Sequence, residues 1–518
     1  MGNNLNAFRQ TVTVQDGSGA VQFRQDTNYD QTTPTCVTGA PQHDDSGHGC
    51  SFNSRANATS VTIYTNPSAP SGGITQTLTY DTLGNLRTAK DALNNTTTLA
   101  YSPDAWGNTA CPPSATTYAF PVSASNALSQ TTNFTYFACT GQPASVTDPN
   151  NQTTSIAYDS LLRPTQTNLP DGGQTTITYN SQTSISTSTK MNSTQNIIGT
   201  LLLDGLGRTL HTQLNSDPQG VDYVDTSYDS LGRVASVSNP YRSTSDPTYG
   251  ITSYVYDALS RICVVVPPDG TAVSGNTCPA SQPSNDLFAT YSGNTTTVTD
   301  QAGTKRSSNI DGLGRLSQIT EAPGGAGYVT TYVYDAFGNI TGVTQNGGRQ
   351  RTYVFDALSR LTTETNPESG TTNYYFTTSG GALCSGSASQ VCRRTDPRSI
   401  TTTYSFDALN RLTQKSYSDG ITPTASFLYD VASTNGVSIS NPVGRLVRST
   451  TSGALTQNIN SYDPLGRVTT QWINTPNYTG PASFVPTYSY DLAGNLTVRL
   501  EWSGSYDFLR LRRCRSPN

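Results

Sequence analysis

The chain has 518 residues, of which 34% are hydrophobic and 13% charged, and its net charge of −5 gives a pI near 5.2. This acidic balance argues against nucleic acid as the main partner, and no apolar run approaches the length that spans a membrane. Disordered chains combine many charges with few aromatic residues, whereas 29 tyrosines and 14 phenylalanines recur here at regular positions, so a folded chain is expected.

The first 77 residues are expected to hold degenerate repeats. Residues 14–21 place a Gly-rich turn signal between apolar residues and predict a hairpin near the N-terminus. Cys36 and Cys50 then enclose a loop that holds His43, His48 and two aspartates, at positions 44 and 45. These side chains suffice to bind zinc, but their spacing matches no common zinc pattern. A Cys36–Cys50 disulfide is therefore favoured over a metal site.

From residue 78 to residue 497 a short phrase recurs: an aromatic residue, Asp, two variable residues, Gly, and Arg or Asn. Uninterrupted copies lie 21 residues apart, as do Tyr158 and Tyr179, and other steps are lengthened by insertions. A fixed period of this size indicates a repeat array in which each unit packs mainly on its neighbours. The Asp and Gly of the fullest copies, predicted to be structural turn residues, are Asp81, Gly84, Asp229, Gly232, Asp311, Gly314, Asp335, Gly338, Asp463, Gly466, Asp491 and Gly494.

Each copy of the phrase predicts a β-hairpin. Alternation such as Tyr332 and Tyr334 places two aromatic rings on one face of a strand. Asp at the first position of a type I turn accepts backbone N–H bonds, and Gly at the fourth supplies a positive φ. A second turn signal, such as residues 170–172 (Pro-Asp-Gly), then closes the unit. The sequence therefore predicts an all-β chain folded as one long antiparallel meander.

Some copies lack the turn glycine. Asn410 tolerates a left-handed backbone, whereas Leu162, Ser260 and Ser359 do so poorly, so distorted turns are expected at these three residues. The arginines that follow the turn glycine are expected to pair with the turn Asp or to lie across an aromatic ring, and not to bind a ligand. These arginines are Arg208, Arg233, Arg315 and Arg467.

The nine cysteines fall into four pairs of sequence neighbours, each flanking a stretch rich in Gly, Ser or Pro, with Cys514 left over. A disulfide at the neck of such a loop stabilises by roughly 3 kcal/mol and is typical of exported proteins, which favours an extracellular or cell-surface location. Reduced cytosolic thiols remain the alternative, because the N-terminus shows no signal-peptide pattern. The candidate pairs are Cys36 with Cys50, Cys111 with Cys139, Cys263 with Cys278, and Cys384 with Cys392.

Catalytic patterns are weak. The recurrent aspartates occupy one turn position, so a structural role is favoured over the paired carboxylates of a glycosidase. No Gly-x-Ser-x-Gly elbow supports a serine hydrolase, and His211 is expected to be a surface residue. No cofactor is expected.

The phrase resembles the YDxxGRL repeat of Rhs/YD-repeat proteins. Matches stand at residues 228–234, 310–316 and 462–468, and copies with a substituted Gly at 256–262, 355–361 and 406–412. The resemblance implies hairpins joined in a continuous sheet that spirals into a partial shell. Such shells enclose a toxin in bacterial relatives and serve adhesion in teneurins. The implied partners are an encapsulated polypeptide or other shell segments.

The chain also departs from the family pattern. The Asp-Pro-x-Gly motif at which bacterial relatives cleave themselves is absent, and residues 441–444 (Asn-Pro-Val-Gly) continue as an ordinary repeat. Residues 498–518 form an Arg-rich, non-repeat tail, read either as a solvated terminus or as the product of truncation or a frame shift. No toxin is expected in this sequence.

The sequence favours a non-enzymatic scaffold that forms part of a secreted or surface shell around a partner or toxin segment not encoded here. A carbohydrate- or protein-binding adhesin is the alternative, because Tyr-rich sheet faces and Asn/Thr-rich loops suit sugar stacking. A hydrolase is disfavoured, since no site supports it. Neighbouring toxin and immunity genes would favour the shell, and a solitary gene with a surface anchor would favour the adhesin.

Overall fold

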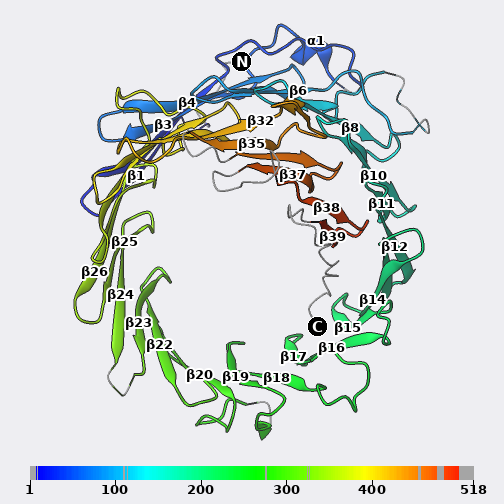
Figure 1. Cartoon of the computed structure of the whole chain (residues 1–518), viewed down its shortest axis with the longest axis vertical. Helices are drawn as coiled ribbons and strands as arrows, with labels where there is room; N and C mark the ends of the chain where they lie inside the picture. The colour runs from blue at the N-terminus through cyan, green and yellow to red at the C-terminus, as the bar shows by residue number, and fades with distance from the viewer. Residues whose placement is uncertain are drawn as a thin grey trace. The chain divides into compact units, whose positions relative to one another are not determined.

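The structure is a computed structural model that describes residues 8–500 except 9, 42, 109–110, 112, 114, 275–276, 324, 326, 453–456 and 475–483. Within these residues the chain forms 39 strands and one four-residue helix, α1 (Asp45–His48) (Figure 1). Thirty-seven of these strands belong to one sheet, and β33 (Ser433–Thr434) pairs with β34 (Val437–Ser438) in a separate hairpin. The predicted all-β, antiparallel fold is confirmed.

The chain divides into two compact units. Unit 1 comprises residues 1–173, 354–364 and 369–518, and unit 2 comprises residues 174–353 and 365–368. Among the described residues no helix is long and apolar enough to cross a membrane.

Unit 1 holds two stretches of sheet, here called the first and second segments. The strands of the first segment are β1 (Thr11–Gln15), β2 (Val21–Tyr29), β3 (Ala58–Asn66), β4 (Ser71–Tyr80), β5 (Leu86–Lys90), β6 (Thr96–Ala100), β7 (Ser123–Ser125), β8 (Thr131–Tyr136), β9 (Pro143–Thr147), β10 (Thr153–Tyr158) and β11 (Pro164–Asn168). Those of the second are β28 (Gly370–Tyr375), β29 (Arg393–Thr395), β30 (Thr401–Phe406), β31 (Leu412–Tyr417), β32 (Ala425–Tyr429), β35 (Leu446–Thr451), β36 (Gln457–Tyr462), β37 (Val468–Asn474), β38 (Thr487–Tyr490) and β39 (Leu496–Leu500).

The strands of unit 2 follow one another in the same way. They are β12 (Gln174–Ser181), β13 (Ser184–Lys190), β14 (Asn196–Leu203), β15 (Thr209–Leu214), β16 (Asp222–Tyr228), β17 (Val234–Ser238), β18 (Ile251–Tyr256), β19 (Ile262–Val266), β20 (Leu287–Ser292), β21 (Thr295–Thr299), β22 (Lys305–Ile310), β23 (Leu316–Glu321), β24 (Tyr328–Tyr334), β25 (Ile340–Gln345), β26 (Arg349–Phe355) and β27 (Leu361–Asn366), the last two crossing the unit boundaries.

Consecutive strands pair antiparallel, which is the predicted meander. In the hairpins that carry the repeated phrase, the register shifts by one residue beside the aromatic residue, as between Ser227 and Tyr228 or between Val333 and Tyr334. A type I turn followed by a left-handed residue produces this one-residue bulge. Because strands alternate in direction, the turns of the phrase all lie on one edge of the sheet, here called the YD edge, and the intervening loops lie on the opposite, far edge.

Buried apolar clusters are small. In unit 2, Val264 and Phe288 belong to one such cluster, and in unit 1 Val447 and Ile459 belong to another, with Trp472 packed against it. Most strand residues are only half-buried. A sheet of this kind depends on its turns and on contacts between neighbouring hairpins more than on a thick core.

Candidate functional site: the two edges of the sheet

The turn of the repeated phrase is held by its aspartate. In the hairpin of β16 and β17, Gly232 donates to the carbonyl of Asp229 at 3.0 Å, and Asp229 donates to the carbonyl of Arg233 at 2.9 Å. Oδ1 of Asp229 accepts from the backbone N–H groups of Leu231 and Arg233, both at 2.9 Å. Gly232 has a φ of 81°. Equivalent backbone bonds and a positive φ at the fourth residue occur at Asp81 with Gly84, Asp311 with Gly314, Asp335 with Gly338, Asp463 with Gly466, and Asp491 with Gly494.

The arginine of each turn links its hairpin to the next one. Arg233 Nε donates to Asp229 Oδ2 at 2.7 Å, and its guanidinium lies 4.4 Å from the ring centre of Tyr256 in the following phrase. The hydroxyl of Tyr256 in turn donates to the carbonyl of Val234 at 2.8 Å. Each such rung combines an ion pair, a cation–π contact and a hydrogen bond. Other complete rungs join Arg208 to Tyr228, Arg261 to Tyr291, Arg315 to Tyr334, Arg411 to Tyr429 and Arg467 to Tyr490.

The expectation of distorted turns at non-glycine copies is wrong. Leu162, Ser260 and Ser359 take φ values of 62°, 63° and 56°, as Asn410 does at 64°. Each of these turns keeps the two backbone bonds found in the glycine copies. The aspartate carboxylate and the strand pairing fix the loop, so the residue adopts the left-handed backbone at a cost of about 1 to 2 kcal/mol.

Aspartate turns also occur on the far edge, where sequence reasoning identified only general turn signals. At residues 148–152, Asp148 Oδ1 accepts from the backbone N–H groups of Asn150 and Gln152, both at 2.8 Å. Loops 91–95, 300–304 and 396–400 share the backbone pattern. Their signal is an Asp followed three residues later by Asn, Gly or Ser, without the preceding aromatic residue.

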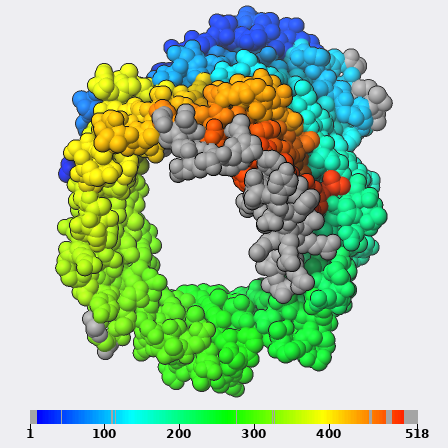
Figure 2. All heavy atoms as spheres, viewed as in Figure 1, coloured from blue at the N-terminus to red at the C-terminus, as the bar shows by residue number. Residues whose placement is uncertain are grey.

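Within unit 1 the far edge of the first segment packs against the YD edge of the second. Asn95 Nδ2 donates to the carbonyl of Gly386 at 2.8 Å, across 291 residues of sequence. Asn150 donates from Nδ2 to the carbonyl of Val443 at 2.9 Å and accepts the Val443 N–H at 2.8 Å, across 293 residues. In the space-filling view the orange strands of the second segment lie against the blue and cyan strands of the first (Figure 2).

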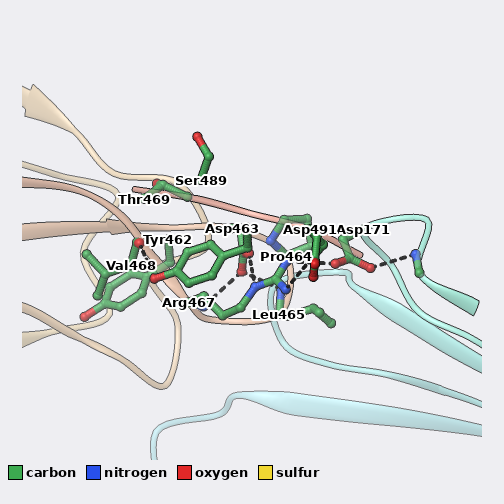
Figure 3. A network of polar contacts seen from close by, with 12 residues as sticks. Asp171, Tyr462, Asp463, Pro464, Leu465, Arg467, Val468, Thr469, Ser489 and Asp491 are labelled. Carbon is green, nitrogen blue, oxygen red and sulfur yellow. Dashed lines mark hydrogen bonds and ion pairs between the residues drawn. The ribbon is translucent and has the colours of Figure 1, made fainter. Parts of the chain in front are cut away.

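An ion pair completes this contact. Arg467 Nη2 lies 2.8 Å from Asp171 Oδ2, across 296 residues, while its Nε contacts Asp463 Oδ2 at 2.5 Å (Figure 3). The side chains of Arg467 and Asp171 are only 20% and 8% exposed. Arg467 Nη1 also donates to the carbonyl of Asp491 at 3.3 Å. One guanidinium therefore ties its own turn, the next hairpin and the other segment together.

The loop around α1 covers the first complete turn of the phrase. Thr82 is fully buried, and its hydroxyl lies 2.9 Å from both the N–H and the carbonyl of Val37. Arg55 donates to the carbonyl of Thr82 at 2.6 Å. His43 and His48 pair with Asp45 and Asp44 on this loop. Among the described residues, no three His, Cys, Asp or Glu side chains gather as a metal site would require.

The four predicted cysteine pairs are joined in the structure, namely Cys36–Cys50, Cys111–Cys139, Cys263–Cys278 and Cys384–Cys392. Cys514 and the Arg-rich tail from residue 501 onward lie outside the described residues. The bridges anchor loops between strands, of the kind expected from the sequence.

His211 is not the surface residue that was expected. Its side chain is 21% exposed, pairs through Nδ1 with Asp225, and packs against the ring of Tyr223. The hydroxyl of Tyr241 donates to the other oxygen of the same carboxylate at 2.6 Å, which raises the pKa of Tyr241 to about 12. The opposing position of Asp225 on β16 brings these groups together. The tyrosine rings, including Tyr249, pack on one another.

The turn carboxylates should make the free energy of unfolding depend on pH. Backbone N–H bonds from the following arginine lower the pKa of Asp204, Asp257 and Asp311 below the usual 3.8. A lowered folded-state pKa means that the unfolded chain binds more protons, so this stabilisation is present above pH 4 and is lost as pH falls through the folded pKa values. Burial raises the pKa of Asp286, which contributes in the opposite direction. Urea unfolding at pH 6 and below pH 4 should show the loss, and unchanged stability would contradict it.

Substitution of the turn glycines on the YD edge tests the assignment of these turns. Gly232→Val and Gly338→Val each place a β-branched residue at a φ above 80°, which should cost on the order of 1 to 3 kcal/mol. An added Cβ would lie 2.9 Å from Arg208 Nη1 at Gly232 but would meet no atom within 4 Å at Gly338, so the second variant isolates backbone strain. Thr97→Ser on an exposed strand position is the control. Equal urea midpoints for all three variants would refute the turn assignment.

Comparisons with known proteins point in one direction. A family model described as RHS Repeat matches residues 311–350, 334–371 and 390–422. The chain is similar to the crystal structure of TcdB2-TccC3, with a TM-score of 0.61 and 13% identity, covering 93% of this chain and 30% of that one. It is also similar to TcdB2-TccC3 without its hypervariable C-terminal region, with a TM-score of 0.53 and 13% identity, covering 92% and 33%.

These likenesses concern the fold, because the identities are low. The chain spans about a third of the length of the structures it matches. No curated protein matches the sequence.

Proposed function

The chain carries RHS repeats, and we propose that it is a non-enzymatic scaffold that forms part of a secreted or surface shell around a polypeptide segment. The observation that carries this proposal is the edge contact in unit 1, where hairpins almost 300 residues apart in sequence bond to each other through Asn95, Asn150 and Arg467. When the opposite edges of a sheet are complementary, successive stretches of the sheet can pack edge to edge. They then form a continuous layer that needs no thick apolar core.

The chemistry of the repeats supports a scaffold. The Asp and Arg side chains that repeat along the YD edge are engaged with each other and with backbone groups, as at Asp229 and Arg233. Charged groups that bond within the turn are not positioned as acids or bases for a substrate. The likeness to TcdB2-TccC3 supports the same fold, and the toxin-type partner is taken from the family resemblance. The extracellular location rests on the four disulfides.

Protection of an unfolded segment tests this proposal. A short unstructured reporter is fused after Asn518, and its cleavage by thermolysin is followed on the folded chain. Enclosure predicts cleavage at least tenfold slower than for the same reporter on a small monomeric carrier. An Arg467→Ala variant, which weakens the edge contact, should restore much of the rate. Cleavage at the carrier's rate in the folded wild type would refute enclosure.

Sugar binding is the second candidate, and the aromatic cluster of Tyr223, Tyr241 and Tyr249 is the observation that favours it. Sugar stacking needs a free aromatic face, whereas these rings contact each other in tilted and edge-on pairs and Tyr241 bonds to Asp225. The scaffold is therefore preferred. Saturation-transfer NMR with glucose, galactose and N-acetylglucosamine, compared with a Tyr241→Ala variant, distinguishes the two: signal lost in the variant supports the adhesin.

A further inference from the structure

Leucines at the third position of the repeated turn are strongly exposed along the YD edge of unit 2. Leu206, Leu231, Leu259 and Leu313 are 80%, 72%, 73% and 77% exposed. They occupy the same position in successive copies of the turn and therefore lie along one edge of the sheet. A row of large apolar side chains on a protein surface marks a site of interaction.

In the second segment of unit 1, whose YD edge packs against the first segment, the equivalent leucines are covered, whereas Leu161 on the YD edge of the first segment is 69% exposed. Three leucines of unit 1 occupy the same turn position on the YD edge and are half-buried: Leu358, Leu409 and Leu465. Leu465 lies in the turn whose arginine pairs with Asp171 of the first segment (Figure 3). The turn position is thus shielded on the segment where another hairpin edge packs against it.

The far edge shows the same contrast. In the docked loop 148–152 of unit 1, Asn150 is half-buried and bonds across the contact. In unit 2, loop 300–304 has the same backbone bonds, including Thr304 N–H to Asp300 Oδ1 at 2.8 Å, yet its residues 301–304 are all exposed. Unit 2 therefore presents both surfaces that pack against each other in unit 1.

We propose that unit 2 binds a second copy of this chain edge to edge. The leucine row of one copy receives the far-edge loops of the other, around loop 300–304, and repeats the contact already made within unit 1. Arg261 holds the turn position that Arg467 holds in unit 1, and its side chain is 40% exposed while it pairs with Asp257. Asp300 on the far edge carries the opposite charge. Because the two surfaces differ, the contact is head-to-tail, and copies can add successively.

Sedimentation velocity of the full chain over a concentration series tests the association. The wild type should form dimers and larger species as concentration rises. The double variant Leu231→Asn/Leu259→Asn, which keeps turn-compatible residues, should weaken association by roughly 100-fold, since two leucines lose their burial. Val333→Thr removes exposed apolar surface from strand β24 of unit 2 and not from a turn, so this variant should associate like the wild type.

A mixing experiment separates a head-to-tail contact from other modes. Ala302→Arg blocks the far-edge loop but leaves the leucine row intact. Each variant alone should be monomeric, and an equimolar mixture should form a dimer that does not grow further. A wild type that stays monomeric, or variants that associate like the wild type, would overturn the proposal. A far-edge variant that dimerises alone would show a symmetric leucine-to-leucine contact, which also overturns it.

Discussion

Replacing Arg467 with alanine is expected to lower the free energy of unfolding by about 3 to 5 kcal/mol, because two poorly exposed carboxylates then lose their partner. Asp171 and Asp463 both bond to this guanidinium, at 2.8 and 2.5 Å. The variant also loses the cation–π contact with Tyr490. Urea unfolding followed by circular dichroism measures the change.

Arg315 is a matched control, because it makes the same contacts along the sheet. It pairs with Asp311, lies over Tyr334 and donates to the carbonyl of Asp335. Arg315→Ala should cost about 1 to 2 kcal/mol. The difference between the two variants isolates the cross-segment pair, and a double-mutant cycle of Arg467→Ala with Asp171→Ala should give a coupling above about 1 kcal/mol. Equal losses for the two arginine variants would show that the edge contact adds no stability.

Breaking the Cys263–Cys278 bridge should cost about 3 kcal/mol, since it closes a loop of 15 residues. A Cys263→Ala/Cys278→Ala variant measured against the wild type, with and without reductant, gives the value. Reductant should lower the stability of the wild type, but affect the variant only through the three other bridges.

The same cysteines decide the compartment. Non-reduced peptide mapping of native material should find Cys263 joined to Cys278 and Cys384 joined to Cys392, with Cys514 free or linked between chains. Local pairing is expected because the Cα atoms of these pairs lie 5.8 and 5.4 Å apart. Alkylation of every cysteine as a free thiol would remove the case for an extracellular location and leave the repeat fold intact.

The sequence predicted the hairpins because their causes are local. Alternating aromatic residues, an Asp that bonds to its own turn and a residue with positive φ act within about ten residues, as in residues 228–234. The prediction of a distorted turn at Leu162 was wrong because it considered only the low preference of leucine for a left-handed backbone. The Asp159 carboxylate fixes that turn by accepting two backbone N–H bonds. The pairing of His211 with Asp225 depends on strand register, which a single sequence does not reveal.

The contact between Arg467 and Asp171 could not be predicted from the sequence, because it joins residues that are distant along the chain. Both residues belong to ordinary turn signals, and no local sequence feature indicates that they meet across a separation of 296 residues. The insertions between repeats change the length of chain between the two edges, so no fixed period links them. The role of Arg467 in its own turn could be predicted, and its role between segments could not.

The edge contact changes how the two units lose structure. In unit 2 the described rungs, such as Arg233 with Tyr256, couple each hairpin only to the next, which is the behaviour of a one-dimensional chain of repeats. In unit 1 bonds such as Asn150 with Val443 add coupling in a second direction. Unfolding of one hairpin in unit 1 must therefore break its bonds to the neighbouring hairpins and also its bonds to the other segment. Unfolding of one hairpin in unit 2 breaks only the bonds to the hairpins before and after it. Hydrogen exchange of the backbone amides in unit 2 should therefore reflect the unfolding of single hairpins. In unit 1 the amides of many hairpins should exchange together, in one cooperative unfolding event.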